Sequence, residues 1–243
     1  MNEIMEVNKR LLKNRALIFI GLYRCVALAI VFSTVFATTL DGNVLDEGNL
    51  PQNLQDIPEG WQSLFDGKTL TNWKILRYGG NGTPYVRNGA LVLPKPTEGV
   101  MTGVCWIGDA LPENNYEVYY EARRVAGTDI FAGFTFPYSE TSASLVFGGW
   151  GGVVNGLSSI DGLDASENET CQRFSWPDNR WYPVQLRVTP DSICASVGVE
   201  CIVNIATAGK DIHLRADYLD TGFTLWTYNT TGEIRNIRIR KIF

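Results

Sequence analysis

One segment, residues 148–170, carries the side chains best suited to chemistry in this sequence of 243 residues. Its first half places glycines around Trp150, and its second half holds carboxylates and no basic residue. Carboxylates act as general bases and as ligands for hard cations, so the segment could serve proton transfer or cation binding. Long irregular segments inside a compact domain are usually functional or disordered. Its acidic residues are Asp161, Asp164, Glu167 and Glu169.

Three of these carboxylates define the metal site that the sequence suggests. Asp161, Asp164 and Glu167 are close in sequence, and Ca²⁺ prefers clustered oxygen ligands. A divalent cation such as calcium is therefore the cofactor that this pattern could bind, although the spacing is not that of an EF-hand loop. The alternative is a solvated acidic loop in which Asp161-Gly162 forms a turn. The glycines around Trp150 would then supply only backbone turns or bulges with positive φ.

Short strand patterns surround this segment and would position it. Residues 115–124 alternate between two faces, and residues 85–93 predict a hairpin with Asn88-Gly89 at its turn. About twelve short strands at regular spacing, without an amphipathic helix longer than a turn or two, predict an all-β sandwich or jelly roll. We expect a single domain over residues 59–243, which is long enough for a sizeable core. Its first and last strands should lie near each other.

Composition argues against a nucleic-acid partner. The net charge is −5, and nucleic-acid binding needs clustered lysine and arginine. The dense basic run beyond the N-terminus follows the pattern of a C-terminal strand, so we interpret it as a solvated sheet face. That run consists of Arg235, Arg238, Arg240 and Lys241.

The N-terminus predicts export. A basic region precedes an apolar run whose uninterrupted part, residues 25–37, has the length of a signal-peptide core, and Val35-x-Ala37 fits a cleavage site. We therefore expect a cleaved signal peptide over residues 1–37, with an uncleaved membrane anchor as the alternative, and a polar linker over residues 38–58. Either would place the domain in the periplasm or outside the cell. In that setting Cys194 and Cys201, which flank a predicted turn, could form a disulfide or remain thiols.

Four motifs carry a family resemblance over residues 59–243. GWQSLFDGKTLTNWK opens the domain at residues 60–74, a short hairpin follows at residues 85–91, Arg180-Trp181-Tyr182 lies in a strand, and IRNIRIRKI ends the chain at residues 234–242. Together they resemble the DUF1080 family, also called the 3-keto-disaccharide hydrolase or 3-keto-glucoside 1,2-lyase/hydratase domain. The resemblance implies a concanavalin A-like jelly roll. The central strands depart from the family's NSGIFFR and YE-x-QILD, because this chain has TDIFAGFTFP and LVFGGW there.

The resemblance also implies a chemistry. A base would remove the C2 proton of a sugar oxidised at C3, a hydrogen-bond donor or cation would stabilise the enolate, and the group at C1 would leave. Aromatic rings would hold the sugar. The catalytic candidates are Asp129, Asp161, Glu169 and Arg173. The substrate-binding candidates are Trp150, Arg123 and Trp226, for which packing inside the domain is the alternative role.

Two other functions stay open at this point. The departure from the family's acidic strand equally suits a non-catalytic, lectin-like carbohydrate-binding module or a cell-surface adhesion domain. His213 is the single histidine, and its short apolar surroundings favour a structural role. Catalysis by the candidates requires at least two of them to converge with Trp150 in one concave pocket.

Overall fold

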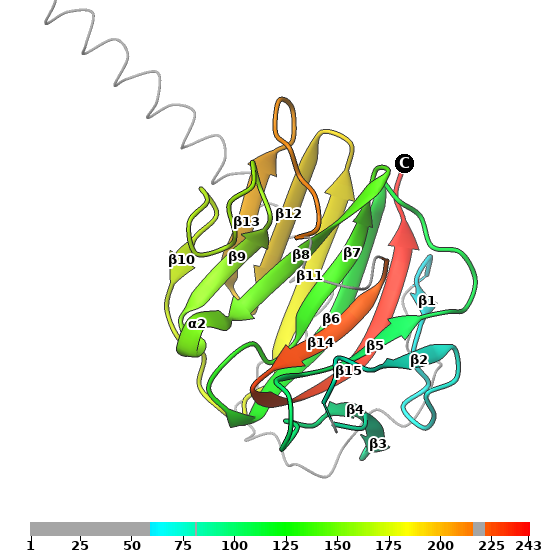
Figure 1. Cartoon of the computed structure of the whole chain (residues 1–243). Coiled ribbons are helices and arrows are strands. Elements are labelled where there is room, and N and C mark those ends of the chain that lie inside the picture. Colours follow the sequence, from blue (N-terminus) through cyan, green and yellow to red (C-terminus); the bar gives the residue numbers. More distant parts are fainter. Residues whose placement is uncertain (1–58, 81, 216–221) are drawn as a thin grey trace, which may run out of the picture. The chain divides into compact units, whose positions relative to one another are not determined.

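The computed structural model describes residues 59–80, 82–215 and 222–243, and these residues are nearly all β (Figure 1). Their strands form two antiparallel sheets that stack as a sandwich, which confirms the predicted jelly-roll class. The bounds are β1 Gln62–Ser63, β2 Trp73–Leu76, β3 Tyr85–Arg87, β4 Ala90–Leu93, β5 Met101–Trp106, β6 Tyr116–Gly127, β7 Gly133–Tyr138, β8 Thr141–Gly148, α2 Gly149–Gly152, β9 Val154–Ser158, β10 Gln172–Arg173, β11 Tyr182–Thr189, β12 Ser192–Val197, β13 Glu200–Ala206, β14 Thr224–Tyr228 and β15 Thr230–Lys241.

The strand order places the ends of the domain together. Sheet I has the order β13-β12-β11-β6-β15-β4-β3, and β1 also pairs with β15. Sheet II has the order β10-β9-β8-β7-β14-β5-β2. Ser63 in β1 lies opposite Arg238 in β15, so the expected proximity of the first and last strands is confirmed.

The core lies between the two sheets and follows the alternation seen in the sequence. On β6, Tyr116, Val118 and Tyr120 are buried, and β11 presents Val184 opposite Tyr120. Sheet II contributes phenylalanine rings to the same core, and Phe134 packs edge-on against Tyr120 at 5.7 Å. Successive strand residues point to opposite faces, so the intervening residues of β6 form the outer face of sheet I.

The segment 148–170 is more regular than its sequence suggested. It contains β9, which lies in sheet II between β8 and the short edge strand β10. All five residues of β9 are buried, so the alternation that announces a half-exposed strand is absent. Beyond β9 the strand structure is short, because residues 172–173 alone form β10 and Ile212 makes a single bridge with Ile160.

Cys194 and Cys201 do not form the disulfide considered from the sequence. The β12–β13 register places Cys194 opposite Asn204 and Cys201 opposite Ser196, with an irregularity between Ala195 and Ser196. Both side chains are thiols, and each donates a hydrogen bond, Cys194 to the Asn204 side chain at 3.3 Å and Cys201 to a backbone carbonyl at 3.7 Å. The irregular register thus moves the two sulfur atoms out of facing positions.

The predicted signal or anchor segment, residues 1–37, and the linker, residues 38–58, lie outside the described residues. Within the described part of the chain, none of the helical structure is long and apolar enough to cross a bilayer.

Candidate functional site

The glycines after β8 form a left-handed turn that presents Trp150. Gly148, Trp150 and Gly151 have φ values of 72°, 50° and 78°, so the predicted need for positive φ is confirmed. The Asp129 carboxylate holds this turn, because Oδ2 accepts a hydrogen bond from the Gly151 N–H at 3.1 Å. Its Oδ1 accepts from the Ile130 N–H at 2.9 Å. Asp129 therefore supports the backbone of the turn that carries the half-exposed Trp150 side chain.

Arg124 lies beneath the turn and was missed by the sequence analysis. Its side chain is buried, its Nε donates to the Asp178 carboxylate at 2.5 Å and its Nη2 donates to the Trp176 carbonyl at 2.6 Å. A side chain at Gly152 would come within 3.3 Å of Nη1, so the guanidinium needs glycine there. The two-residue alternation of β6 could have predicted its burial, because Arg124 follows the inward-facing positions Tyr120 and Ala122.

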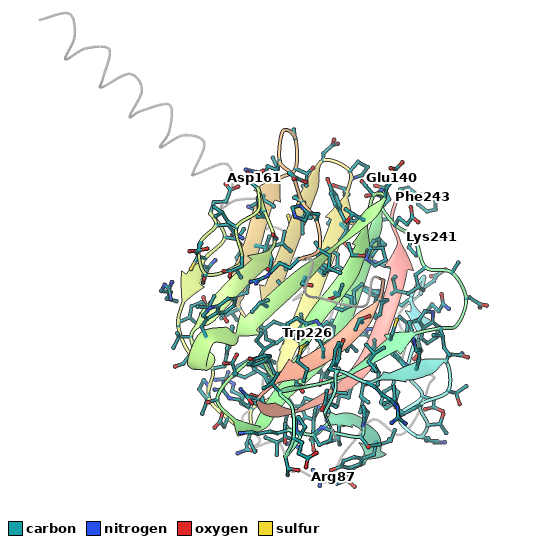
Figure 2. The ribbon with its side chains drawn as sticks, viewed as in Figure 1. Arg87, Glu140, Asp161, Trp226, Lys241 and Phe243 are labelled. Atoms are coloured by element: carbon teal, nitrogen blue, oxygen red, sulfur yellow. The ribbon has the colours of Figure 1, made fainter. Side chains whose placement is uncertain are left out.

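The other acidic candidates join two loops at the far end of β8 and β9. The Asp161 carboxylate accepts the Asp211 backbone N–H at 2.8 Å, and Glu169 forms an ion pair with Lys210. The hydrogen bond from Lys210 to Glu169 raises the pKa of the lysine. β8 runs from Thr141 to Gly148 and β9 runs back beside it, so Asp161 and α2 lie at opposite ends of these strands (Figures 1 and 2).

The predicted catalytic set therefore does not form one site. Asp129 alone accompanies Trp150, whereas Asp161 and Glu169 connect the loops at the other end. Arg173 is exposed on the edge strand β10 and donates to the Ser166 carbonyl at 3.1 Å. The convergence that catalysis by these residues requires is not met, because Asp161 and Glu169 are bonded to Asp211 and Lys210 at the end of the strands away from Trp150.

The metal prediction is wrong for the described residues, which hold no group of three His, Cys, Asp or Glu side chains able to bind an ion. The reason is local pairing. Asp164 accepts from Arg215 at 2.9 Å and from the Ser166 hydroxyl at 2.6 Å, and Asp161 bonds to the backbone. Glu167 is exposed and completes no cluster.

Trp226 is not a sugar platform, because its side chain is 1% exposed. It lies on the outer side of sheet II across two glycines of the neighbouring strands, Gly103 and Gly133. Its indole N–H donates to the Thr135 hydroxyl at 3.2 Å. The ring packs in a second small apolar cluster with Ile130, Val146, Val154 and Ala165. The alternative packing role is thus confirmed for Trp226.

Arg123 lies on the other sheet. It points out of sheet I, donates to Glu233 at 2.8 Å and lies over the Trp181 ring at 4.7 Å. Its side chain therefore points to the face of sheet I opposite to that of Arg124, away from the turn that presents Trp150. His213 is exposed, with Nδ1 3.1 Å from the Asp211 carboxylate.

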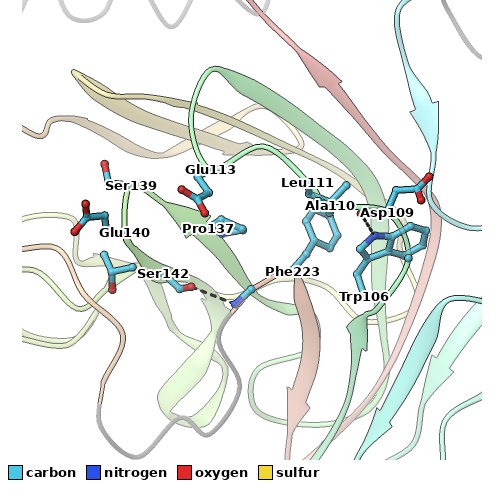
Figure 3. A pocket seen from close by; sticks show the side chains of 13 residues that line it. Trp106, Asp109, Ala110, Leu111, Glu113, Pro137, Ser139, Glu140, Ser142 and Phe223 are labelled. Atoms are coloured by element: carbon cyan, nitrogen blue, oxygen red, sulfur yellow. Dashed lines mark hydrogen bonds between the residues drawn. The ribbon is translucent and has the colours of Figure 1, made fainter.

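A cavity of about 400 Å³ opens between the β5–β6 loop and the β7–β8 hairpin (Figure 3). That volume falls within the ~300–1,000 Å³ typical of small-molecule sites. Trp106 and Phe223 line it, and the Trp106 indole N–H donates to the Asp109 carbonyl at 2.9 Å, which orients the ring. Trp73 packs edge-on against Trp106 at 5.4 Å and supports it from the core side.

Three carboxylates and several hydroxyls line the same cavity. Asp109, Glu113 and Glu140 are exposed, and the Ser142 hydroxyl accepts the Gly222 N–H at 3.2 Å (Figure 3). Among the described residues that line it, none is Lys, Arg or His. The cavity thus combines aromatic rings with hydrogen-bond acceptors and hydroxyl donors. Sequence reasoning missed it because its acidic residues come from separate loops without a shared motif.

The sequence matches the model of one protein family over residues 60–240, and that model describes a 3-keto-alpha-glucoside-1,2-lyase-like domain. The chain belongs to this family. Membership confirms the resemblance seen in the sequence and makes the described part a carbohydrate-active, glycosyl hydrolase-like domain. No curated protein matches the chain.

Solved structures support the fold of this 3-keto-alpha-glucoside-1,2-lyase-like domain. A candidate glycosyl hydrolase from Parabacteroides distasonis ATCC 8503 is 17% identical, with a TM-score of 0.51, over 84% of this chain and 100% of its own. The Crh5 transglycosylase in complex with NAG is 8% identical, with a TM-score of 0.54, over 75% and 84%. A Bacillus subtilis protein of unknown function with a galectin-like fold is 10% identical, with a TM-score of 0.50, over 71% and 90%.

Proposed function

We propose that the domain binds a glucoside oxidised at C3 in the cavity between the β5–β6 loop and the β7–β8 hairpin. The carrying observation is the joint lining of that cavity by Trp106, Phe223 and the Glu113 and Glu140 carboxylates. Aromatic rings pack against the apolar face of a sugar, and carboxylates accept hydrogen bonds from its hydroxyls. The family's 3-keto-glucoside description supplies the class of sugar.

The binding proposal is tested with methyl 3-keto-α-glucoside and the full-length protein by calorimetry. We expect binding, and we expect Glu113→Gln to weaken it about tenfold, because hydrogen bonds to charged groups contribute ~1.5–3 kcal/mol. Glu200→Gln, an exposed carboxylate at the β12–β13 turn, is the matched control and should bind as the wild type does. Equal affinities of both variants would refute the assignment of the cavity.

Catalysis on the same sugar is a second candidate function, favoured by the family match and by the carboxylates in the cavity. A carboxylate would take the C2 proton, the electrons would form the enolate of the C3 ketone, and the group at C1 would leave with its bonding pair. Water would then add across the new double bond. The hydroxyls of Ser139, Thr141 and Ser142 would donate to the enolate, since the described residues that line the cavity include no Lys, Arg or His.

Release of p-nitrophenolate from p-nitrophenyl 3-keto-α-glucoside separates the two functions. If Glu113 is the base, wild-type protein turns the sugar over and Glu113→Gln reduces the rate about 10²–10⁴-fold. Binding without release of p-nitrophenolate would leave the lectin-like function alone. Addition of EDTA should change neither result, because the proposed step uses only side chains of this cavity.

Export of the domain is also part of the proposal, and it is supported by the basic and apolar pattern of residues 1–37. We expect the mature chain to begin at Thr38. N-terminal sequencing of protein recovered from the periplasm or the medium checks this, and an intact N-terminus on membrane-bound protein would support the anchor alternative. Recovery of the intact chain from the cytosol would contradict export.

A further inference from the structure

The outer face of sheet I carries an unusual concentration of charge for a protein with a net charge of −5. It faces away from the core, on the side of the sandwich opposite to sheet II, and takes its charged residues from four strands, β3, β6, β11 and β15. Its charged members are Arg87, Arg123, Arg187, Arg235, Arg238 and Arg240 with Glu117, Glu121 and Glu233. We call this set the arginine face.

Each end of the arginine face has two guanidinium groups on one buried carboxylate. The Glu233 side chain is 4% exposed, and it binds Arg87 at 2.8 Å and Arg123 at 2.7 Å. The two arginine side chains are 50% and 31% exposed. The negative carboxylate is thus buried against the sheet, while the positive guanidinium groups reach solvent.

The same arrangement recurs around Glu117, whose side chain is 5% exposed. Arg187 binds it at 2.8 Å and Arg240 at 2.5 Å, and these arginines are about one-third exposed. Glu121 pairs with Arg235 at 2.7 Å. The two arginines on one glutamate at each end leave one surplus positive charge apiece, and Arg238 adds a third.

Aromatic rings also hold three of the guanidinium groups in place. Arg235 and Arg123 lie over the Trp181 ring at 4.1 and 4.7 Å, and Arg238 lies over the Tyr119 ring at 4.2 Å. Stacking of this kind fixes a guanidinium plane, so less side-chain entropy is lost when a ligand binds. Each guanidinium has five N–H donors, and one carboxylate contact leaves others directed to solvent.

We propose that the arginine face binds an acidic polysaccharide, a chain of uronic acid units, through its carboxylates. Planar guanidinium forks match carboxylates in bidentate geometry. The face extends from β11 to β3, which is about 19 Å at the usual strand spacing, so it suits an extended polymer better than a single small anion. One charge per sugar fits a partly neutralised face, whereas the denser charge of nucleic acid needs clustered, unneutralised Lys and Arg.

This site is separate from the proposed function, because the sugar cavity is lined by carboxylates and would repel a polyuronate. The test uses full-length protein and polygalacturonate in affinity electrophoresis, with dextran as the neutral polymer. We expect retardation by polygalacturonate, which weakens as salt rises, and none by dextran. Equal retardation by both polymers, or by neither, would overturn the proposal, as would stronger retardation by DNA or by anionic vesicles.

The decisive variant is Arg87→Gln/Arg187→Gln. Glu233 and Glu117 each keep one arginine, so the fold should survive, while the surplus of three charges falls to one. We expect the affinity for polygalacturonate to fall about tenfold or more. Lys74→Gln/Arg77→Gln, which removes two exposed charges at and just after the edge strand β2, is the matched control. Equal losses in both double variants would also overturn the proposal.

Discussion

Trp226→Ala is expected to lower the free energy of unfolding by about 3–5 kcal/mol, the usual cost of truncating a buried Trp. The ring is 1% exposed and lies across Gly103 and Gly133, which leave no side chain to fill the space. Loss of the ring would also leave the Thr135 hydroxyl without its indole donor. Urea denaturation followed by far-UV circular dichroism measures the change.

Trp150→Ala is the matched control, since both tryptophans were predicted from the sequence to hold sugar. The Trp150 side chain is exposed and its residue keeps the same positive φ in the variant, so we expect a change below about 0.5 kcal/mol. Comparable destabilisation by both variants would contradict the packing role of Trp226. A loss of sugar binding in Trp150→Ala alone would move the ligand site from the cavity to the turn.

Much of the fold could be predicted because it follows from the alternation of side chains. β6, β11 and the β3–β4 hairpin each show a two-residue period or a turn pair that the structure reproduces. β9 could not be found in this way. All five of its residues are buried, so its sequence lacks the alternation of apolar and polar residues that predicts a half-exposed strand.

The site was harder to predict because carboxylate chemistry depends on partners that are distant in sequence. Asp129 precedes β7 closely and reaches the Gly151 N–H in the turn that carries Trp150. Asp161 and Glu169 have the same residue types, but Asp211 and Lys210 from a different loop engage them. Nothing within the segment 148–170 indicates those partners.

The basic strand at the C-terminus also depends on partners that are distant in sequence. A solvated face was expected for Arg235, Arg238 and Arg240, and all three are half-buried on the outer side of β15. The sequence does not show that Glu117 and Glu121 of β6 lie beneath them, because that pairing depends on the β6–β15 register. The β6–β15 register places these glutamates opposite the arginines, and the resulting ion pairs fix the positions of the guanidinium groups.

Gly232→Ala is expected to lower the free energy of unfolding by about 3 kcal/mol or more, because overpacking against backbone cannot relax easily. A Cβ at Gly232 would lie 1.9 Å from the Phe131 carbonyl oxygen. The backbone around Phe131 would have to move away from β15, and it carries the neighbouring Asp129. The Asp129 N–H donates to the Thr230 hydroxyl at 2.9 Å, so this bond should lengthen as well.

Gly209→Ala separates this clash from ordinary backbone strain. Gly209 has a φ of 75° and no atom within 4 Å of an added Cβ, so alanine there should cost about 1 kcal/mol through φ alone. Hydrogen exchange of the Gly151 N–H reports on the site, because that group donates to the Asp129 carboxylate. We expect the Gly151 N–H to exchange faster in Gly232→Ala than in the wild type, and at the wild-type rate in Gly209→Ala. Equal stability of the two variants would show that the sheets tolerate a wider separation at Phe131, and the turn that presents Trp150 would then not depend on the glycine in β15.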